Sequence, residues 1–415
     1  MSGSSRGPRH DLLACYRAAL AAVDGRTAVR EHLLRHGPDG PLHLVAVGKA
    51  AVAMALGAID VIGPSLVAGL VISKEGHGDP ELDANPAIRY LDSDHPVPGN
   101  RSLAAGQALV TFLTTAPSNA RFLFLGSGGA SSLVELLPHG FDLQGLRRLN
   151  DWLLGSGHDI GTMNRVRKGC SRIKGGRLLS WLGSRQAWNL LISDVPGDNP
   201  AVIGSGLLVP ERSHSRPWPS DLPPWVRRWL VAPEAEKKGA KVESIVIASN
   251  GDACRAARDK AVELGYRAEI GERSLDGPLD QAAAHIVAVL DSGEPGITVW
   301  GGETTVVLPE NPGRGGRNQH LALTVASKID GCDDLFLLAA GTDGTDGPGE
   351  DAGGLVDGGT LTRGRDGGLD PQRCLREADS GRFLEAAGDL LQTGPTGTNV
   401  MDVAIGLRLD DGSGQ

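Results

Sequence analysis

Short apolar runs recur along the chain, and each is followed by a turn containing glycine or serine and then by a segment rich in Ala and Leu. An apolar run before such a turn predicts a buried strand, and the periodic segment predicts the helix that follows it. Helices are predicted over residues 11–23 and 320–329. The predicted strands are residues 42–47, 122–125, 190–192, 245–248, 297–300 and 335–340. Strands that alternate with helices predict an α/β fold, in which ligands gather beyond the carboxyl ends of the strands.

The pattern is interrupted between residues 210 and 241, where Pro, Trp and charged residues break every period. We place a domain boundary there and predict two domains, residues 1–238 and residues 239–415. The chain has 415 residues, with 40% hydrophobic and 22% charged side chains, so it is long and apolar enough for two cores.

The composition argues against several classes of protein. A net charge of -9 and the lack of any long Lys/Arg block argue against nucleic-acid binding. No uninterrupted run of about 18 apolar residues predicts a membrane span, and residues 1–10 lack the apolar core of a signal peptide, so a cytoplasmic location is expected. Five scattered cysteines without a CxxC pair indicate neither a disulfide framework nor a zinc site. The expected partner is a small molecule, and the sequence leaves open a monomer or a homodimer.

Two predicted strands end in turns that suit an anion. After strand 42–47, Lys49 lies in the first turn of a helix, where a cation opposes the helix dipole unless an anion binds. After strand 122–125, a turn with three glycines and several hydroxyls exposes amides that can hold phosphate oxygens. A solvated lysine and an ordinary tight turn are the alternatives. Anion binding is the favoured prediction for Lys49. For the turn residues Gly126, Ser127, Gly128, Gly129 and Ser131, phosphate binding is predicted and an ordinary tight turn stays open.

Asp194 follows the predicted strand 190–192, and the next turn contains two prolines and a glycine. A rigid turn fixes the direction of the carboxylate, as a general base or a metal ligand requires. Upstream, residues 164–177 contain the densest basic cluster of this acidic chain. From that cluster, Arg167 and Lys168 are predicted to bind an anionic substrate. A solvated helix face is the alternative for about half of these charges.

The glycine-rich stretch of residues 301–319 sets the lone carboxylate of Glu303 and the guanidiniums of Arg314 and Arg317 between a predicted strand and a predicted helix. Backbone and charge can both approach an anion in such a loop, which suits a phosphate or a carboxylate. Glu303 and Asn318 of this loop are predicted to bind phosphate, and Arg317 is predicted to bind an anion.

Asp343 and Asp346 lie in a glycine-rich loop after strand 335–340. Two carboxylates in such a loop suit Mg²⁺, which takes one or two protein carboxylates and completes its shell with water and phosphate. A plain acidic turn is the alternative.

No HExxH zinc helix, GxSxG nucleophile elbow or complete dinucleotide fingerprint is present. Anion-binding loops, an oriented Asp and an acidic loop match phosphoryl transfer, where positioning and charge neutralisation dominate. Seven motifs, in order, resemble those of the type II glycerate kinases, also called the MOFRL family, some members of which are named hydroxypyruvate reductase. They are VGKAA (47–51), SGGAS (127–131), MNRVRKGCSRIKGGRL (163–178), SDVPGDNP (193–200), GGETTV with GGRNQ (301–306 and 315–319), TDGTDGP (342–348) and TGPTGTN (393–399).

The resemblance implies ATP-dependent phosphorylation of D-glycerate to 2-phosphoglycerate, with Mg²⁺. It also implies a Rossmann-like, three-layer α/β/α amino-terminal domain, a smaller α/β carboxyl-terminal domain of the MOFRL type, and an active site in the cleft between them. By motif, Lys49, Asp194 and Arg317 fall on positions that the family treats as active-site residues. Residues 167–171 depart from the Arg-Lys-His-Leu-Ser common in relatives, so the reaction type is better predicted than the acceptor.

Our hypothesis is that Asp194 takes the proton of the glycerate 2-hydroxyl while Lys49 and Arg317 neutralise the γ-phosphoryl group and the substrate carboxylate. Asp343 or Asp346 would position Mg²⁺. Two alternatives stay open at this point. One is a reductase that acts on hydroxypyruvate with NAD(P)H, and the other is a sensor that binds sugar acids or nucleotides without turnover.

Overall fold

A computed structural model describes residues 7–210, 217–231 and 241–410 of the chain. Contacts divide the chain into an amino-terminal unit, residues 25–247, and a carboxyl-terminal unit, residues 248–415 together with residues 1–24. Parts of the predicted linker, residues 211–216 and 232–240, lie outside the described residues. The predicted active-site cleft between the two domains stays a prediction.

The amino-terminal unit is built on a six-stranded sheet with the order β3-β2-β1-β4-β5-β6. Pairing is parallel from β3 through β2, β1 and β4 to β5, which is the Rossmann order. The strands are β1 (Leu42–Val47), β2 (Leu66–Lys74), β3 (Ile88–Ser93), β4 (Phe122–Gly126), β5 (Gln186–Ile192) and β6 (Lys241–Ala248). Strand β1 is buried at every position, because helices cover both faces of a parallel sheet and its strands therefore read as continuous apolar runs.

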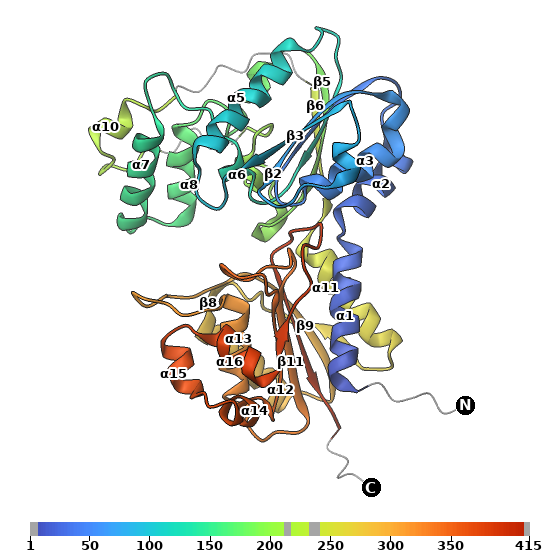
Figure 1. Cartoon of the computed structure of the whole chain (residues 1–415), viewed down its shortest axis with the longest axis vertical. Coiled ribbons are helices and arrows are strands. Elements are labelled where there is room, and N and C mark those ends of the chain that lie inside the picture. The colour runs from blue at the N-terminus through green and yellow to red at the C-terminus, as the bar shows by residue number, and fades with distance from the viewer. Residues whose placement is uncertain (1–6, 211–216, 232–240, 411–415) are drawn as a thin grey trace. The chain divides into compact units, whose positions relative to one another are not determined.

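The helices of this unit lie on both sides of its sheet, with α2 and α3 on one side and α5 on the other (Figure 1). The longer helices are α2 (Gly25–His36), α3 (Ala51–Ile62), α5 (Asn100–Thr115), α7 (Leu143–Gly155) and α8 (Ile160–Gly169). The short helices are α4 (Pro80–Asp83), α6 (Ala130–Leu133), α9 (Leu179–Leu182) and α10 (Pro224–Arg227). Three 3₁₀ turns are η1 (Gly63–Ser65), η2 (Pro196–Asp198) and η3 (Ile203–Ser205). The main core joins β1, β2 and β4 to α5, and a smaller cluster joins α7, α8 and α10.

The carboxyl-terminal unit contains a mixed six-stranded sheet with the order β13-β12-β11-β14-β9-β7. Its strands are β7 (Ala268–Ile270), β9 (Gly296–Gly302), β11 (Leu335–Gly341), β12 (Gly353–Asp357), β13 (Leu390–Leu391) and β14 (Asp402–Arg408). All neighbouring pairs are antiparallel except β7 with β9. A separate pair joins β8 (Gly277–Pro278) and β10 (Thr304–Thr305).

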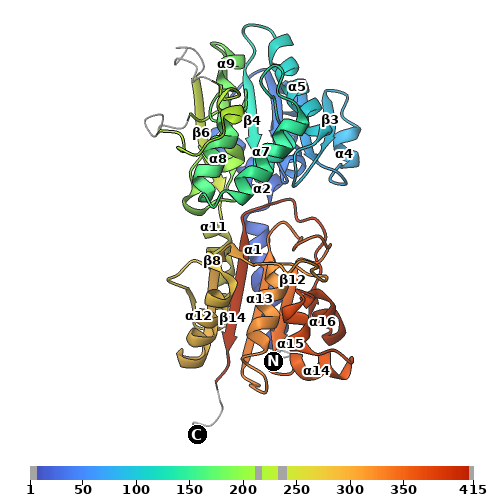
Figure 2. The same ribbon diagram turned by 90° about the vertical axis from the view of Figure 1, so that its left-hand side faces the viewer.

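Helices also cover both faces of this second sheet, with α1 and α11 on one side and α12, α13 and α16 on the other (Figures 1 and 2). They are α1 (Pro8–Ala22), α11 (Asn250–Glu263), α12 (Leu279–Ser292), α13 (Arg317–Ala326), α14 (Thr360–Asp366), α15 (Pro371–Arg376) and α16 (Ser380–Ala387). The core gathers apolar side chains of α12, α13, α16 and the facing strands around the fully buried Trp300.

The predicted α/β fold with two domains is confirmed, and every predicted strand is present. The compact units nevertheless differ from the predicted ranges 1–238 and 239–415, because helix α1 packs within the carboxyl-terminal unit. Its buried Tyr16 donates a hydrogen bond to Gly341 O at 2.6 Å, and Tyr266 donates to Asp11 Oδ2 at 2.8 Å. No described helix has both the length and the apolar character that crossing a bilayer requires.

Candidate active site

The carboxyl ends of β1 and β4 lie side by side in the amino-terminal unit, at the point where the strand order of the sheet reverses. In an open α/β sheet this is where ligands bind, because the connections leave toward opposite faces and open a crevice between them. The turn that carries Lys49 follows β1, and the glycine turn 126–131 follows β4. The structure therefore brings together the two anion-binding turns predicted from separate parts of the sequence.

Backbone hydrogen bonds lock these two turns together. Lys49 N donates to Gly128 O at 2.8 Å, and Ser127 N donates to Val47 O at 3.1 Å. The Ser127 hydroxyl accepts a hydrogen bond from Ala50 N at 3.1 Å, and Ser127 is fully buried. Gly48 has φ +140°, and a Cβ there would lie 2.0 Å from Ser127 Oγ. Ser127, predicted to bind phosphate, thus holds the two turns in register.

Gly129 is the residue of the glycine turn that meets the predicted catalytic cation. Its φ of +82° is in the left-handed region, and a Cβ there would lie 3.1 Å from Lys49 Cγ. The same Cβ would lie 3.2 Å from His95 Cδ2 and Nε2. Lys49 and His95 therefore approach one glycine from two different loops. His95 was not predicted as a site residue, and its only signal in the sequence is its position just after β3.

The loop after β5 carries Asp194 and packs against the glycine turn. Asp194 is partly buried and follows the fully buried Ser193, whose hydroxyl accepts from Val195 N at 3.4 Å. Farther along the same loop, Ser205 Oγ lies 2.6 Å from Ser131 Oγ. The loops with Lys49, Ser131 and Asp194 thus follow three neighbouring strands, β1, β4 and β5.

The basic cluster of residues 164–177 is largely engaged within the protein. Lys168 is buried, and its Nζ donates to Ala201 O at 2.9 Å, so it supports the loop after β5. Lys174 forms a buried ion pair with Glu135. Arg167 instead donates to two neutral acceptors, Oδ1 of Asn150 at 3.0 Å and Oδ1 of Asn164 at 3.1 Å.

Burial lowers the pKa of Arg167 from its usual value. Among the described residues, both side-chain acceptors of Arg167 are uncharged amides, and neither neutralises its positive charge. Of the two predicted substrate-binding cations, Arg167 is better suited than Lys168 to attract an anion.

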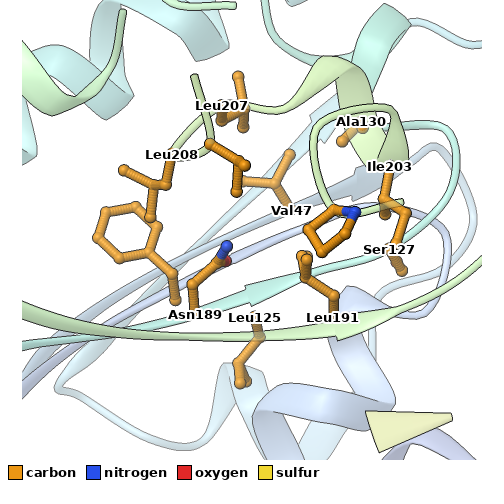
Figure 3. Close-up of a pocket in the computed structure, with 14 residues that line it drawn as sticks. Val47, Leu125, Ser127, Ala130, Asn189, Leu191, Ile203, Leu207 and Leu208 are labelled. Carbon is orange, nitrogen blue, oxygen red and sulfur yellow. The ribbon is translucent and has the colours of Figure 1, made fainter. Parts of the chain in front are cut away.

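A small apolar pocket lies beneath the loop after β5 (Figure 3). Val47, Leu125 and Leu191 line it from the strands, and Ile203 and Leu208 line it from the loop. Its volume of about 30 Å³ is enough for one or two water molecules but not for a nucleotide or a sugar acid. The pocket is therefore a packing feature, and a ligand of the two turns would bind outside it.

In the carboxyl-terminal unit, Arg317 is the first residue of α13 and is held by two carboxylates. Its Nε lies 2.6 Å and its Nη2 3.2 Å from the two oxygens of Asp402, and its Nη1 lies 2.6 Å from Glu303 Oε1. Burial acts to lower the pKa of Arg317, but Asp402 and Glu303 outweigh it and raise the pKa above the usual value. Arg314, the other guanidinium of this stretch, is paired with Asp351 and Glu385.

Asp346 caps the amino terminus of α13. Its Oδ1 accepts from Asn318 N at 3.0 Å and from Asn318 Nδ2 at 3.3 Å, and its Oδ2 accepts from Gln319 N at 2.8 Å. Burial raises the pKa of Asp346 to about 6, and the two amide hydrogen bonds oppose that rise. Asp346 and Asn318, predicted to bind metal and nucleotide, are thus both buried and bonded to each other.

Asp343 is less enclosed than Asp346. Its Oδ1 accepts from Thr345 N and from Thr345 Oγ1, both at 3.0 Å. Within the ranges that the structure describes, no group of three or more His, Cys, Asp or Glu residues could hold a metal ion. A Mg²⁺ site here would need most of its ligands from water or phosphate.

Tyr16 and Asp402 complete this acidic region and were absent from the predicted site. Burial raises the pKa of Tyr16, and the carboxylates of Asp343, Asp402 and Asp346 raise it further. The last of the seven motifs, residues 393–399, borders an open hollow of about 480 Å³ in the same unit. Distance along the sequence hides these residues, since Gly341 follows Tyr16 by 325 positions and Asp402 follows Arg317 by 85.

Family comparisons agree with the two-part architecture. Residues 11–218 match a family described as a domain of unknown function (DUF4147), and residues 296–402 match the MOFRL family. A D-glycerate 2-kinase of Thermotoga maritima is 37% identical over 406 residues, which cover 94% of this chain and 96% of that protein. The chain belongs to the glycerate 2-kinase (MOFRL) family.

Other members of the MOFRL family agree in length and fold. A glycerate 2-kinase of Pyrococcus horikoshii is 34% identical, covering 94% of this chain and 93% of that protein. The crystal structure of a glycerate kinase from Thermotoga maritima superposes with a TM-score of 0.85 at 35% identity, covering 97% of this chain and 99% of that one. A relative from Agrobacterium vitis, 34% identical over 97% of this chain and 95% of that protein, carries the provisional name of a hydroxypyruvate reductase.

Proposed function

We propose that this chain transfers the γ-phosphoryl group of ATP to the 2-hydroxyl group of D-glycerate. The observation that carries the proposal is the 37% identity to a D-glycerate 2-kinase over 94% of the chain. The geometry supports it, because a lysine and a glycine turn meet at the sheet position where α/β proteins bind phosphates.

In the amino-terminal unit, Lys49 would neutralise the transferred phosphoryl group. The glycine turn would hold phosphate oxygens through the backbone amides of Gly126, Gly128 and Gly129, and Ser127 would hold that turn against the β1 turn. Asp194, on the rigid loop after β5, would accept the proton of the 2-hydroxyl group. Arg167 would attract the substrate carboxylate from the edge of the site.

In the carboxyl-terminal unit, Arg317 would bind a phosphate or the substrate carboxylate in exchange for part of its contact with Glu303. That exchange is supported by the difference in exposure between the two partners, since the Glu303 side chain is 44% exposed and that of Asp402 only 10%. Asp402 would keep the guanidinium oriented while Glu303 moves aside. Asn318 would act indirectly, through Asp346 and the start of α13.

Mg²⁺ bound to ATP would neutralise charge on the phosphates. Of the two predicted carboxylates, Asp343 fits this ion better, because it is partly exposed whereas Asp346 is buried. Asp346 fits poorly, since both of its oxygens accept amides at the start of α13. The chain's own residues would supply cations, amides and a base, which is the set that phosphoryl transfer requires.

A second candidate function is the reduction of hydroxypyruvate with NAD(P)H, which the provisional name of the Agrobacterium vitis relative favours. The turn after β4 does not favour it. Ser131 stands where a dinucleotide-binding turn has its third glycine, and its hydroxyl contacts Ser205.

The test is an assay of the purified full-length chain with D-glycerate, Mg²⁺ and ATP, in which ADP release is followed. Hydroxypyruvate with NADH and with NADPH is run in parallel, and ATP without glycerate gives the background. We expect ADP release that depends on glycerate. Oxidation of NAD(P)H without ADP release would replace the kinase by the reductase, and no reaction in either assay would favour a binding protein without turnover.

A further inference from the structure

His95 lies beside the proposed phosphate site. A Cβ on Gly129 would lie 3.2 Å from His95 Nε2 and 3.1 Å from Lys49 Cγ. The imidazole edge and the lysine stem therefore border the same glycine, on the turn whose amides would face phosphate. His95 is only partly buried, so its ring can reach a ligand bound at this turn.

The two residues before His95 fix its position. Ser93 is buried, and its hydroxyl donates to Leu133 O at 2.6 Å, which ties the end of β3 to helix α6. Asp94 Oδ2 accepts from Arg101 N at 2.8 Å and from Ser102 N at 3.4 Å, which caps helix α5. The segment is thus anchored on two helices immediately before the imidazole.

A fixed side chain at this place has a direct chemical use. Groups that stabilise charge in a transition state work best when they are held in place before the reaction, because no energy is then spent on moving them. The imidazole edge and the lysine stem border one glycine, so the ring N–H and the lysine ammonium could both donate to a single anionic oxygen.

We propose that His95 donates a hydrogen bond from its imidazole ring to the anionic oxygen that Lys49 binds, as an additional catalytic residue of the phosphoryl transfer. The inference rests on the proposed function, since the anionic oxygen belongs either to the transferred phosphoryl group or to the glycerate carboxylate. Both sources share the same chemistry.

The test compares His95→Ala and His95→Gln with the wild type, and His139→Ala, which removes an exposed histidine of the same unit, is the control. We expect His95→Ala to lower kcat/KM about a hundredfold, as the loss of one charge-stabilising donor does. His95→Gln should recover part of that loss, because its amide can place a donor near the position of Nε2. A rise in KM for glycerate assigns the bond to the carboxylate, and a fall in kcat assigns it to the phosphoryl group.

A folded His95→Ala variant with the same kcat/KM as His139→Ala would overturn the inference. If His95→Ala does not fold, NMR of the histidine ring nitrogens of the wild type tests the contact instead. The His95 signal is the one that disappears in His95→Gln. The His95 signal should shift when ADP with Mg²⁺, inorganic phosphate or D-glycerate is added, while the His139 signal stays in place. No shift with any of the three would reject the contact.

The two proposals fail in different ways. Absence of ADP release by the wild type would reject the kinase, and the titration with inorganic phosphate and ADP would still test His95. An active wild type with an unaffected His95→Ala variant would reject only His95.

Discussion

Lys49 and Arg317 carry the same charge, but the structure holds them in different ways. Lys49 is placed through its backbone, by the bond to Gly128 O, and its stem meets Gly129. Arg317 is placed through its guanidinium, by Asp402 and Glu303. The stem of Lys49 borders a glycine and an imidazole ring. The guanidinium of Arg317 borders two carboxylates, with which an anion must compete.

This difference predicts unequal roles for the two cations. Lys49 lies at a glycine turn where a ligand can come close, and its backbone is held in place before a ligand binds. A guanidinium between two carboxylates is well oriented but partly neutralised. We therefore expect Lys49 to dominate catalysis and Arg317 to combine a catalytic with a structural role.

The largest effect is expected for Lys49→Met, which keeps an unbranched stem against Gly129 but removes the charge. The value of kcat should fall about a thousandfold, because the developing charge on the phosphoryl group loses its nearest cation. Lys241→Met, which alters an exposed lysine of the same unit, is the control. Steady-state kinetics measure kcat for both variants, and unchanged circular dichroism shows that they are folded. Near-normal turnover by Lys49→Met would mean that Lys49 is not catalytic.

Arg317→Ala should lower kcat/KM about a hundredfold and should also lower the melting temperature, because Asp402 is left buried without its partner. The double variant Arg317→Ala/Asp402→Asn should regain stability but not activity. Thermal melting and kinetics on both variants separate the two roles. Recovery of activity in the double variant would mean that Arg317 serves only to neutralise Asp402.

The variant Asp346→Asn tests whether Asp346 is a helix cap whose carboxyl group has a raised pKa. The folded pKa of about 6 lies above the ordinary value of 3.8, so the folded protein binds this proton more tightly than the unfolded chain. Protonation of Asp346 therefore stabilises the folded protein. This stabilisation is complete at a pH below the ordinary pKa and is lost as the pH rises through about 6. Between roughly pH 4.5 and 7.5, the free energy of unfolding of the wild type should fall by about 2 kcal/mol relative to the variant.

Denaturant unfolding at several pH values measures this difference. The Mg²⁺ concentration needed for half-maximal activity should not change in Asp346→Asn if Asp346 acts as a helix cap. A marked rise in that concentration would instead make Asp346 a metal ligand.

The smallest effect is expected for Gly129→Ala, with a loss in kcat/KM of about tenfold, because Lys49 and His95 must each shift by a few tenths of an ångström. Gly183→Ala is a matched control, since Gly183 also has a positive φ of +64° but has nothing within 4 Å of an added Cβ. Both variants should lose similar stability, about 1 kcal/mol. Equal activity of the two variants would show that contact with Gly129 does not matter.

The sequence predicts the local parts of this structure well. The strand and turn around Lys49 and the glycine turn 126–131 are found where their apolar runs and glycines predict them, because each signal lies within about ten residues. The features that the sequence does not predict depend on contacts between residues that are far apart in the chain. The capping role of Asp346 depends on the start of α13, and the contact of His95 with Gly129 depends on helix α6 and strand β3.

The packing of helix α1 in the carboxyl-terminal unit could not be predicted from a local sequence pattern either. Its apolar period predicts a helix over residues 11–23 but does not say which sheet the helix covers. That depends on partners such as Gly341 and Tyr266, far along the chain. The same limit hides Asp402, because a carboxylate at the start of a strand gives no sign that an arginine pairs with it.

The role of Lys49 in phosphoryl transfer is tested by ³¹P NMR of the reaction of D-glycerate with Mg²⁺ and ATP, with the wild type and Lys49→Met side by side. We expect the wild type to form 2-phosphoglycerate and ADP in equal amounts, whereas a folded Lys49→Met forms neither at a comparable rate. Formation of 3-phosphoglycerate, or equal rates from the two proteins, would contradict this expectation.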